Sequence, residues 1–354
     1  MRKAFALGVA IALLCLGRVT QADVYNLGPG LTNLETVTVG NAGNTADTRY
    51  GNPACGGVDY TYNIGKYEVT AAQYTDFLNH KAKSDPYGLY NTNMDTAISI
   101  EDGCNIKRSG TSGSYTYSVA SDWANRPVNF VSYWDSCRFA NWLNNGQGDG
   151  DTETGAYTLN DYNGDDGRWI GRNAGAQWFL PSADEWHKAA YYKGGGTNAG
   201  YWDYPTQSNI APSNEGCDGY TDPGNHANYY NGPYLWAGRY TIGNPYFRTN
   251  VGEFENSASA YGTFDQGGNV WEWNEAISFE GGQTTRDVRG GSFHHFMLNG
   301  SYDLTLRAFV GFYWPSHPNL EYDCLGFRVS QVPEPSALLP LLCGLGGVVC
   351  RRRR

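Results

Sequence analysis

The sequence predicts a loop-rich α+β fold with little regular secondary structure. The 354 residues include 46 glycines, 27 tyrosines and 11 tryptophans, and only 17% are charged. So many aromatic residues argue against disorder, and the length suffices for a sizeable core. Only three segments carry helix-capping patterns, and Gly- and Asn-rich stretches separate them.

The first 22 residues are predicted to be a secretory signal peptide. Arg2 and Lys3 form a positive start, an apolar run covers residues 4–17, and residues 20–22 form an acceptable cleavage site. Asp23 is then the expected start of the mature chain. The positive start and the polar change after residue 17 favour export over a buried first helix.

A lead-in segment and the first two elements follow. Residues 23–55 are polar and Gly/Asn-rich, so we expect a lead-in to the domain. Residues 60–69 alternate in polarity, which predicts a strand. Thr70 is a suitable N-cap for a helix from Ala71 through Leu78, and residues 81–123 then predict a long loop.

Two further helices are predicted from their caps. Ser132, with Asp135 three residues later, begins a helix that reaches Leu143. Ser182, with Glu185 three residues later, begins another that ends near residue 192, before three glycines. The Gly/Asp-rich stretch between them predicts a solvated acidic loop, since its spacing fails the EF-hand pattern. Beyond residue 196 we expect mostly short strands and turns.

The C-terminal segment, residues 332–354, resembles a PEP-CTERM sorting signal of Gram-negative bacteria. Pro333-Glu334-Pro335 precedes a 14-residue apolar run over residues 337–350 and four terminal arginines. The run is shorter than the roughly 20 residues of a spanning helix. The resemblance implies transient membrane anchoring, processing by an exosortase, and display on the outer surface or in the extracellular matrix.

Charge and cysteine content limit the classes of function. Residues 23–331 lack seven of the 25 basic residues and one of the 35 acidic residues, so they carry a formal charge of −16. This charge disfavours broad nucleic-acid binding. Five of the eight cysteines lie in this segment, and export permits disulfides. Cys55 and Cys104, in Gly-containing loops, are the favoured pair, whereas Cys137 is predicted to be buried in a helix.

Six short motifs occur in a fixed order along residues 56–331. They are IGKYEVT at 64–70, RPVN at 126–129, WFLPSADEW at 178–186, GGNVWEW at 267–273, RGGS at 289–292 and LGFR at 325–328. Together they resemble the formylglycine-generating enzyme family, the sulfatase-modifying factors. The resemblance implies a single irregular α+β domain over residues 56–331, related to the C-type lectin fold.

The residues that follow the RGGS motif depart from this family. Its enzymes oxidise a sulfatase cysteine with oxygen, using two copper(I)-binding cysteines shortly after this motif. Here His294 and His295 follow, and the next cysteine is Cys324. Soft thiolates suit copper(I), so we expect neither copper binding nor oxidase activity. The two histidines are the weak catalytic candidates, and the alternative is that they line a degenerate groove.

A calcium loop is also implied by the resemblance. The implied ligands are the side chains of Asp265 and Glu272 and the carbonyls of Gly268 and Val270. Hard cations take oxygen ligands of these kinds. The alternative is a tight turn anchored by tryptophans. A second family calcium site would use residues 227–228, but its acidic partner falls near Gly243, which has no carboxylate.

Three hypotheses of function remain open. The first is an exported, surface-displayed, non-catalytic binding or structural module stabilised by calcium, with a polysaccharide or a peptide as its extracellular ligand. The second is an oxidoreductase of the formylglycine-generating type with an atypical metal site. The third is a non-catalytic partner of a sulfatase. For the first, aromatic residues could stack on the ligand, and the candidates are Tyr229, Tyr230, Tyr234, Trp236, Phe309, Phe312, Tyr313 and Trp314.

Overall fold

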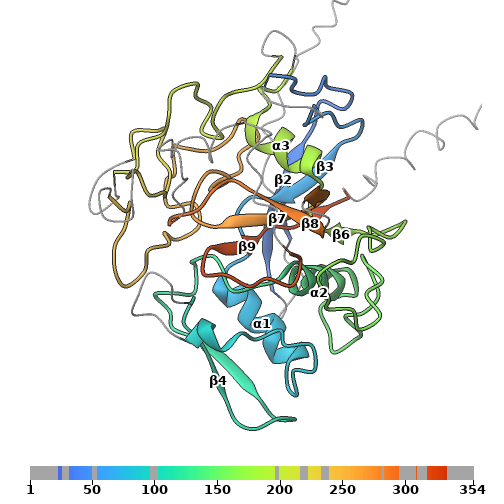
Figure 1. Cartoon of the computed structure of the whole chain (residues 1–354). Helices are drawn as coiled ribbons and strands as arrows, with labels where there is room; N and C mark the ends of the chain where they lie inside the picture. Colours follow the sequence, from blue (N-terminus) through green and yellow to red (C-terminus); the bar gives the residue numbers. More distant parts are fainter. Residues whose placement is uncertain are drawn as a thin grey trace, which may run out of the picture.

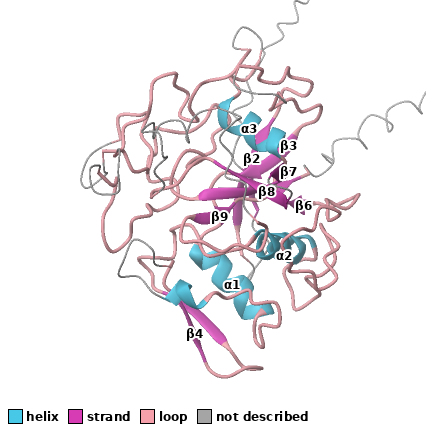
Figure 2. Cartoon of the chain, viewed as in Figure 1, coloured by secondary structure: helices cyan, strands magenta, loops and turns pink. Residues whose placement is uncertain are grey.

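A computed structural model shows short helices and strands joined by long loops (Figures 1 and 2). It describes residues 23–25, 32–49, 54–95, 103–195, 199–215, 222–232, 239–280, 283–294, 308 and 317–332. The predicted signal peptide and all but the first residue of the predicted sorting tail lie outside these residues. In the described part, no helix is both long and apolar enough to cross a membrane.

A five-stranded sheet joins the two ends of the described chain. Its order is β1 (Asp23–Tyr25), β2 (Leu34–Val39), β3 (Tyr62–Gly65), β10 (Ser330–Gln331) and β6 (Trp178–Phe179). β2 pairs with β3, and β10 lies between β3 and β6. The fold therefore begins before residue 56, and the expected lead-in segment supplies two strands of the sheet.

The three predicted helices are confirmed. They are α1 (Ala71–Lys81), α2 (Tyr133–Asn144) and α3 (Ala183–Tyr191). Thr70, Ser132 and Ser182 cap them, and each forms a capping box with the side chain three residues later. In Figure 1, α1 and α2 lie on one side of the central strands and α3 lies on the other.

The prediction of a long loop over residues 81–123 is wrong in part. This stretch contains the 3-10 helix η1 (Thr92–Asp95) and the hairpin of β4 (Ile106–Ser109) and β5 (Thr116–Val119). Its strands are four residues long and their burial is irregular, so the alternation that signals a strand is weak. The turn between them contains a Gly-Thr-Ser-Gly sequence.

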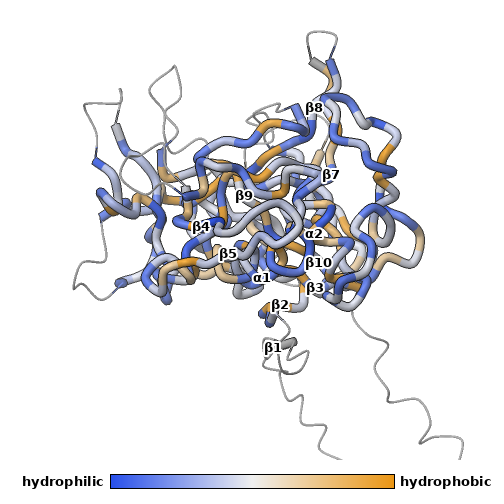
Figure 3. Tube along the Cα trace, turned by 90° about the horizontal axis from the view of Figure 1, so that it is seen from below, coloured by the Kyte–Doolittle hydropathy of each residue, from blue (hydrophilic) through white to orange (hydrophobic). Residues whose placement is uncertain are grey.

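The second main sheet positions two tryptophans of the core. β7 (Trp271–Glu280) pairs antiparallel with β8 (Gln283–Arg289) and parallel with β9 (Leu325–Phe327). Trp271 and Trp273 are buried, and the Trp273 indole donates to the carbonyl of Val131 at 2.9 Å. Figure 3 shows short hydrophobic stretches spread through the body of the domain. The core is therefore assembled from many separate segments.

Candidate functional site

A buried ion pair lies at the junction of β7 and β9. Glu272, on β7, and Arg328, just after β9, have fully buried side chains. The guanidinium donates to the two carboxylate oxygens at 2.5 and 2.6 Å, and the Trp186 indole donates to the same carboxylate at 2.7 Å. Arg328 also donates to the carbonyls of Gly65 and Phe264, each at 2.9 Å. Both oxygens of Glu272, an expected calcium ligand, are thus bonded to protein donors.

Two more carboxylates, Glu68 and Asp265, interact electrostatically with Glu272, and we call the three residues the acidic cluster. Glu68 accepts a hydrogen bond from the side chain of Asn269 at 2.8 Å, and Asp265 accepts one from the backbone of Gly252 at 2.6 Å. Burial and the two neighbouring acids raise the pKa of Glu68 well above its usual range. Burial, with Glu272 nearby, raises the pKa of Asp265 to about 6.

The charge of the acidic cluster suits a hard cation. Arg328 bonds to Glu272 and interacts electrostatically with Glu68 and Asp265, so ionisation of all three carboxylates leaves an excess of negative charge over this one guanidinium. However, no group of three or more His, Cys, Asp or Glu side chains among the described residues is arranged to hold a metal ion. A calcium ion here would therefore need backbone carbonyls, as expected for Gly268 and Val270.

The turn that carries these carbonyls is tightly constrained. Asp265 has a φ of +59°, a conformation that asparagine and aspartate tolerate better than most residues. Gly268 has a φ of +93°, and a Cβ added there would lie 2.1 Å from the carbonyl oxygen of Asn228. The backbone geometry of the expected calcium loop is thus fixed by its neighbours rather than by an ion alone.

The second implied calcium position, at residues 227–228, lies beside the hydroxyl of Thr241, which donates to the carbonyl of Ala227 at 3.3 Å. Buried Asn228 donates from its side chain to the side-chain oxygen of Asn269 at 3.0 Å. The Thr241 hydroxyl accepts from the backbone N–H of Tyr229 at 3.1 Å. Gly243 adds no side chain.

His294 lies directly after the RGGS motif and contacts an acid that the sequence analysis did not single out. Its Nδ1 is 3.0 Å from a carboxylate oxygen of Asp323. Asn129 donates to the backbone carbonyl of Asp323 at 2.6 Å, which helps to hold that segment in place. The contact orients the imidazole, and a histidine so oriented can accept a proton or bind a metal. His295, the other catalytic candidate, lies outside the described residues.

The thiols near this histidine are poor metal ligands. Cys104 and Cys324 are buried, and burial raises the pKa of both thiols. Arg248 interacts with both thiols and opposes the rise without cancelling it. The thiolate is the form that binds copper and attacks as a nucleophile. Both cysteines are therefore neutral thiols at physiological pH.

The expected disulfide between Cys55 and Cys104 is absent. Among the described residues, both cysteines are free, and so is Cys137. Cys104 packs in the main core cluster with α1 and α2, whereas Cys55 donates to the carbonyl of Ala183 at the start of α3. The two thiols belong to different parts of the domain and cannot pair. Cys137 is buried in α2, as predicted.

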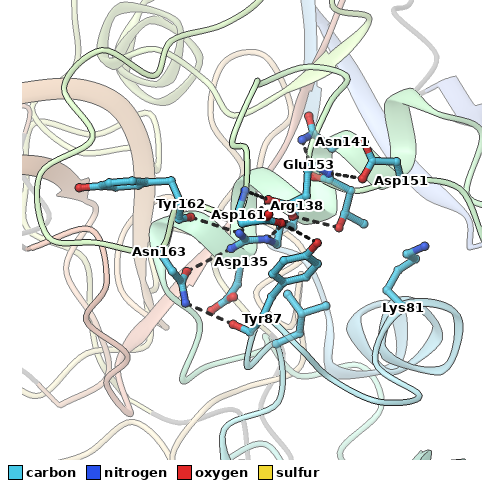
Figure 4. Close-up of polar contacts among 12 residues, drawn as sticks. Lys81, Tyr87, Asp135, Arg138, Asn141, Asp151, Glu153, Asp161, Tyr162 and Asn163 are labelled. Atoms are coloured by element: carbon cyan, nitrogen blue, oxygen red, sulfur yellow. Dashed lines mark hydrogen bonds and ion pairs between the residues drawn. The ribbon is translucent and has the colours of Figure 1, made fainter. Parts of the chain in front are cut away.

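The acidic loop after α2 is organised by an arginine (Figure 4). Buried Arg138 donates to both carboxylate oxygens of Glu153, at 2.7 and 3.0 Å, and to the side chain of Asn163 at 3.1 Å. The backbone N–H of Asp161 donates to the same carboxylate at 2.8 Å. The prediction of a solvated loop is therefore wrong for Glu153, which is buried because Arg138 neutralises it.

The proposed stacking residues divide into two groups. Tyr229 and Tyr230 are buried, with 8% and 1% of their surfaces exposed, so they fill the core and cannot stack on a ligand. The others lie outside the described residues: Tyr234, Trp236, Phe309, Phe312, Tyr313 and Trp314.

The partners of the buried acids could not be predicted from the motifs alone. Glu68 and Arg328 both lie inside the motifs that carry the family resemblance, but the sequence alone assigns them no role. A charged residue within an apolar motif predicts burial, and a buried charge requires a partner of opposite sign. That signal could have suggested that Arg328 pairs with Glu272. No comparable pattern marks Asp323.

Comparison with known proteins identifies the family. The model of the sulfatase-modifying factor enzyme 1-like domain matches residues 33–332. The comparison with curated proteins finds no match. The domain match begins within the expected lead-in segment, in agreement with the position of β2 in the sheet.

Three solved structures are similar over nearly their whole length. The crystal structure of CarF is 20% identical, covers 85% of this chain and 99% of its own, and has a TM-score of 0.50. Treponema denticola variable protein 1 is 17% identical, with coverages of 88% and 98% and a TM-score of 0.47. PvdO from Pseudomonas aeruginosa is 16% identical, with coverages of 88% and 98% and a TM-score of 0.42. The family match and the similarity to CarF confirm the predicted α+β fold class.

Proposed function

Because the chain belongs to the family of the sulfatase-modifying factor enzyme 1-like domain, we propose that it is an exported, surface-displayed member without oxidase activity. It acts as a calcium-stabilised binding or structural module. The observation that supports this most is the segment after the RGGS motif, where His294 contacts Asp323 and no cysteine follows before Cys324. Cys324 itself is a buried thiol with a raised pKa. The paired thiolates required by copper(I) chemistry are therefore missing.

Calcium is proposed to bind at the acidic cluster through Asp265, Glu272 and the carbonyls of Gly268 and Val270. An ion bound only to the folded state stabilises it by RT ln(1 + [L]/Kd), which is about 2.7 kcal/mol when free calcium is 100 times Kd. The ion would also offset the unfavourable ionisation of buried carboxylates.

We expect calcium to raise the melting temperature more at pH 7.5 than at pH 5. The folded-state pKa of Asp265, about 6, exceeds its ordinary value of 3.8. Its protonated form therefore contributes stability that is fully present below pH 3.8 and is lost as the pH rises through 6. Above pH 6, Asp265 is ionised, so calcium can bind its carboxylate and offset the cost of burying that charge. Thermal unfolding in calcium and in chelator at both pH values measures the difference.

Asp265→Asn is the matched variant, because asparagine keeps an oxygen and tolerates the positive φ. In chelator at pH 7.5 it should be more stable than the natural chain by about 1–3 kcal/mol, since it removes the buried charge. The exposed Asp165→Asn substitution is the control and should change nothing. Equal melting temperatures in calcium and chelator at pH 7.5 would count against the calcium proposal.

Export is proposed on the basis of the two terminal signals. We expect the secreted product to lack residues after the Pro333-Glu334-Pro335 triplet, because an exosortase would process the tail. Intact-mass analysis of the extracellular protein measures this directly. A mass that includes Arg351 to Arg354 would contradict it.

The geometry of His294 favours one alternative, an oxidoreductase with an atypical metal site. An imidazole held by Asp323 has the second-sphere contact that metal-ligating histidines often have. Imidazole can bind copper, and His295 would supply a second nitrogen. Copper content after reconstitution and dialysis separates the hypotheses: the non-catalytic module retains no copper, whereas the alternative retains it and loses it on His294→Ala substitution.

A further inference from the structure

An open groove of about 550 Å³ lies at one end of the five-stranded sheet. One wall consists of residues 60–62, which lead into β3. The other consists of residues 172–177 and Phe179 of β6. Val332, directly after β10, lines the same groove. β10 lies between β3 and β6 in the sheet. The groove therefore lies in line with β10, between the segments that flank β3 and β6. We call it the β10 groove.

The register with β3 shows which residues would follow β10 into this groove. Gln331 lies opposite Asn63 in the antiparallel ladder. Each step forward on one antiparallel strand is a step back on its partner. The next three residues therefore come opposite the three that precede Asn63: Val332 opposite Tyr62, Pro333 opposite Thr61, and Glu334 opposite Tyr60.

The register with β6 places the same residues after β10 along the other wall of the groove. Gln331 lies opposite Trp178. The backbone N–H of Val332 donates to the carbonyl of Gln177 at 3.0 Å, so contact with this wall continues beyond β10. The same counting brings Pro333 opposite Ala176 and Glu334 opposite Gly175. All the residues reached in this way line the β10 groove.

We propose that residues 333–335 of this chain occupy the β10 groove as an extension of β10. The sequence has 22 residues after Val332, so the segment is already attached at one end of the groove. Attachment makes its binding intramolecular, which gives it a large advantage over a free peptide. The proposal holds whether or not the chain beyond residue 335 is removed.

The chemistry of the groove suits a proline-containing segment. Proline has no N–H and donates no ladder hydrogen bond, but it favours the extended conformation that an aromatic groove accepts, so the segment can continue along the path of β10. Tyr60 and Val332 are large side chains with 49% and 41% of their surfaces exposed, and both line the groove. A segment lying between the walls would cover this apolar surface, and burial of such surface is favourable.

The test is radical footprinting of the intact chain, which measures the accessibility of side chains in solution. Tyr322 is the internal reference, because it is a tyrosine of similar exposure, 46% against 49% for Tyr60. We expect Tyr60 to be at least threefold less reactive than Tyr322. In the double variant Pro333→Asp with Pro335→Asp, the added carboxylates resist burial, because Arg172, the cation that lines the groove, is already paired with Glu185 and Glu275. Tyr60 should then become as reactive as Tyr322.

The outcomes separate the occupants of the groove. Protection of Tyr60 that is independent of protein concentration and lost in the double variant supports the proposal. Protection that grows with concentration would assign the groove to the tail of a second copy and overturn it. Protection that survives in the double variant would assign it to another ligand and overturn it too. Equal reactivity of Tyr60 and Tyr322 in the natural chain would show that the segment lies elsewhere.

Discussion

Replacing Arg328 with methionine is expected to lower the free energy of unfolding by about 3–5 kcal/mol, because it leaves a buried carboxylate unpaired. Arg328 and Glu272 have no exposed side-chain surface, and the guanidinium is bonded to both carboxylate oxygens. The same guanidinium offsets the charges of Glu68 and Asp265. Loss of this guanidinium therefore removes the charge that offsets the repulsion among the three carboxylates of the acidic cluster when they are ionised.

Chemical denaturation of the purified protein measures this effect. The control is Arg168→Met, which removes an exposed arginine from its ion pair with Asp166 and should have no measurable effect. The double substitution Glu272→Gln with Arg328→Met should recover part of the loss, since it removes the unpaired charge. A loss for Arg328→Met no larger than for the control would show that the pair contributes little.

Replacing Arg138 with methionine is expected to have a comparable cost, about 3–5 kcal/mol. Glu153 is the buried partner, and the backbone of Asp161 also bonds to its carboxylate. Losing the arginine should therefore loosen the loop as well as destabilise the domain. Denaturation measures the loss of stability, and hydrogen exchange over residues 151–163 measures the loosening of the loop.

Hydrogen exchange also distinguishes an arginine-centred loop from an ion-binding loop. In the natural chain, exchange over residues 151–163 should be the same in calcium and in chelator, because Arg138 already neutralises Glu153. Asp165→Asn, at an exposed position in the same loop, is the control and should leave exchange unchanged. Calcium-dependent protection of this loop would contradict the interpretation.

The helices could be predicted from the sequence because their signals are local. Thr70, Ser132 and Ser182 each form a capping box with a residue three positions later, and such a pattern is visible within four residues. The sheet could not be predicted equally well. β2 and β10 are separated by nearly the whole domain, and both pair with β3, which brings these distant segments into one sheet. Short strands of two to six residues carry little periodicity of their own.

The candidate site could be predicted in part for a similar reason. The resemblance supplied Asp265, Glu272 and His294 by their positions in motifs. It could not show that Arg328 bonds to Glu272 or that Asp323 contacts His294, because these contacts join segments far apart in sequence. The disulfide prediction failed on the same ground: two cysteines in similar loops need not be close in space.

The absence of oxidase activity is tested most directly with a sulfatase-type cysteine peptide. The purified protein is incubated with the peptide and oxygen, with and without added copper, and the products are analysed by mass spectrometry. We expect the cysteine peptide to remain unchanged in both conditions, because the segment after the RGGS motif offers His294 in place of paired thiolates. An aldehyde-bearing peptide that disappears with His294→Ala or His295→Ala would contradict this and establish an atypical metal site.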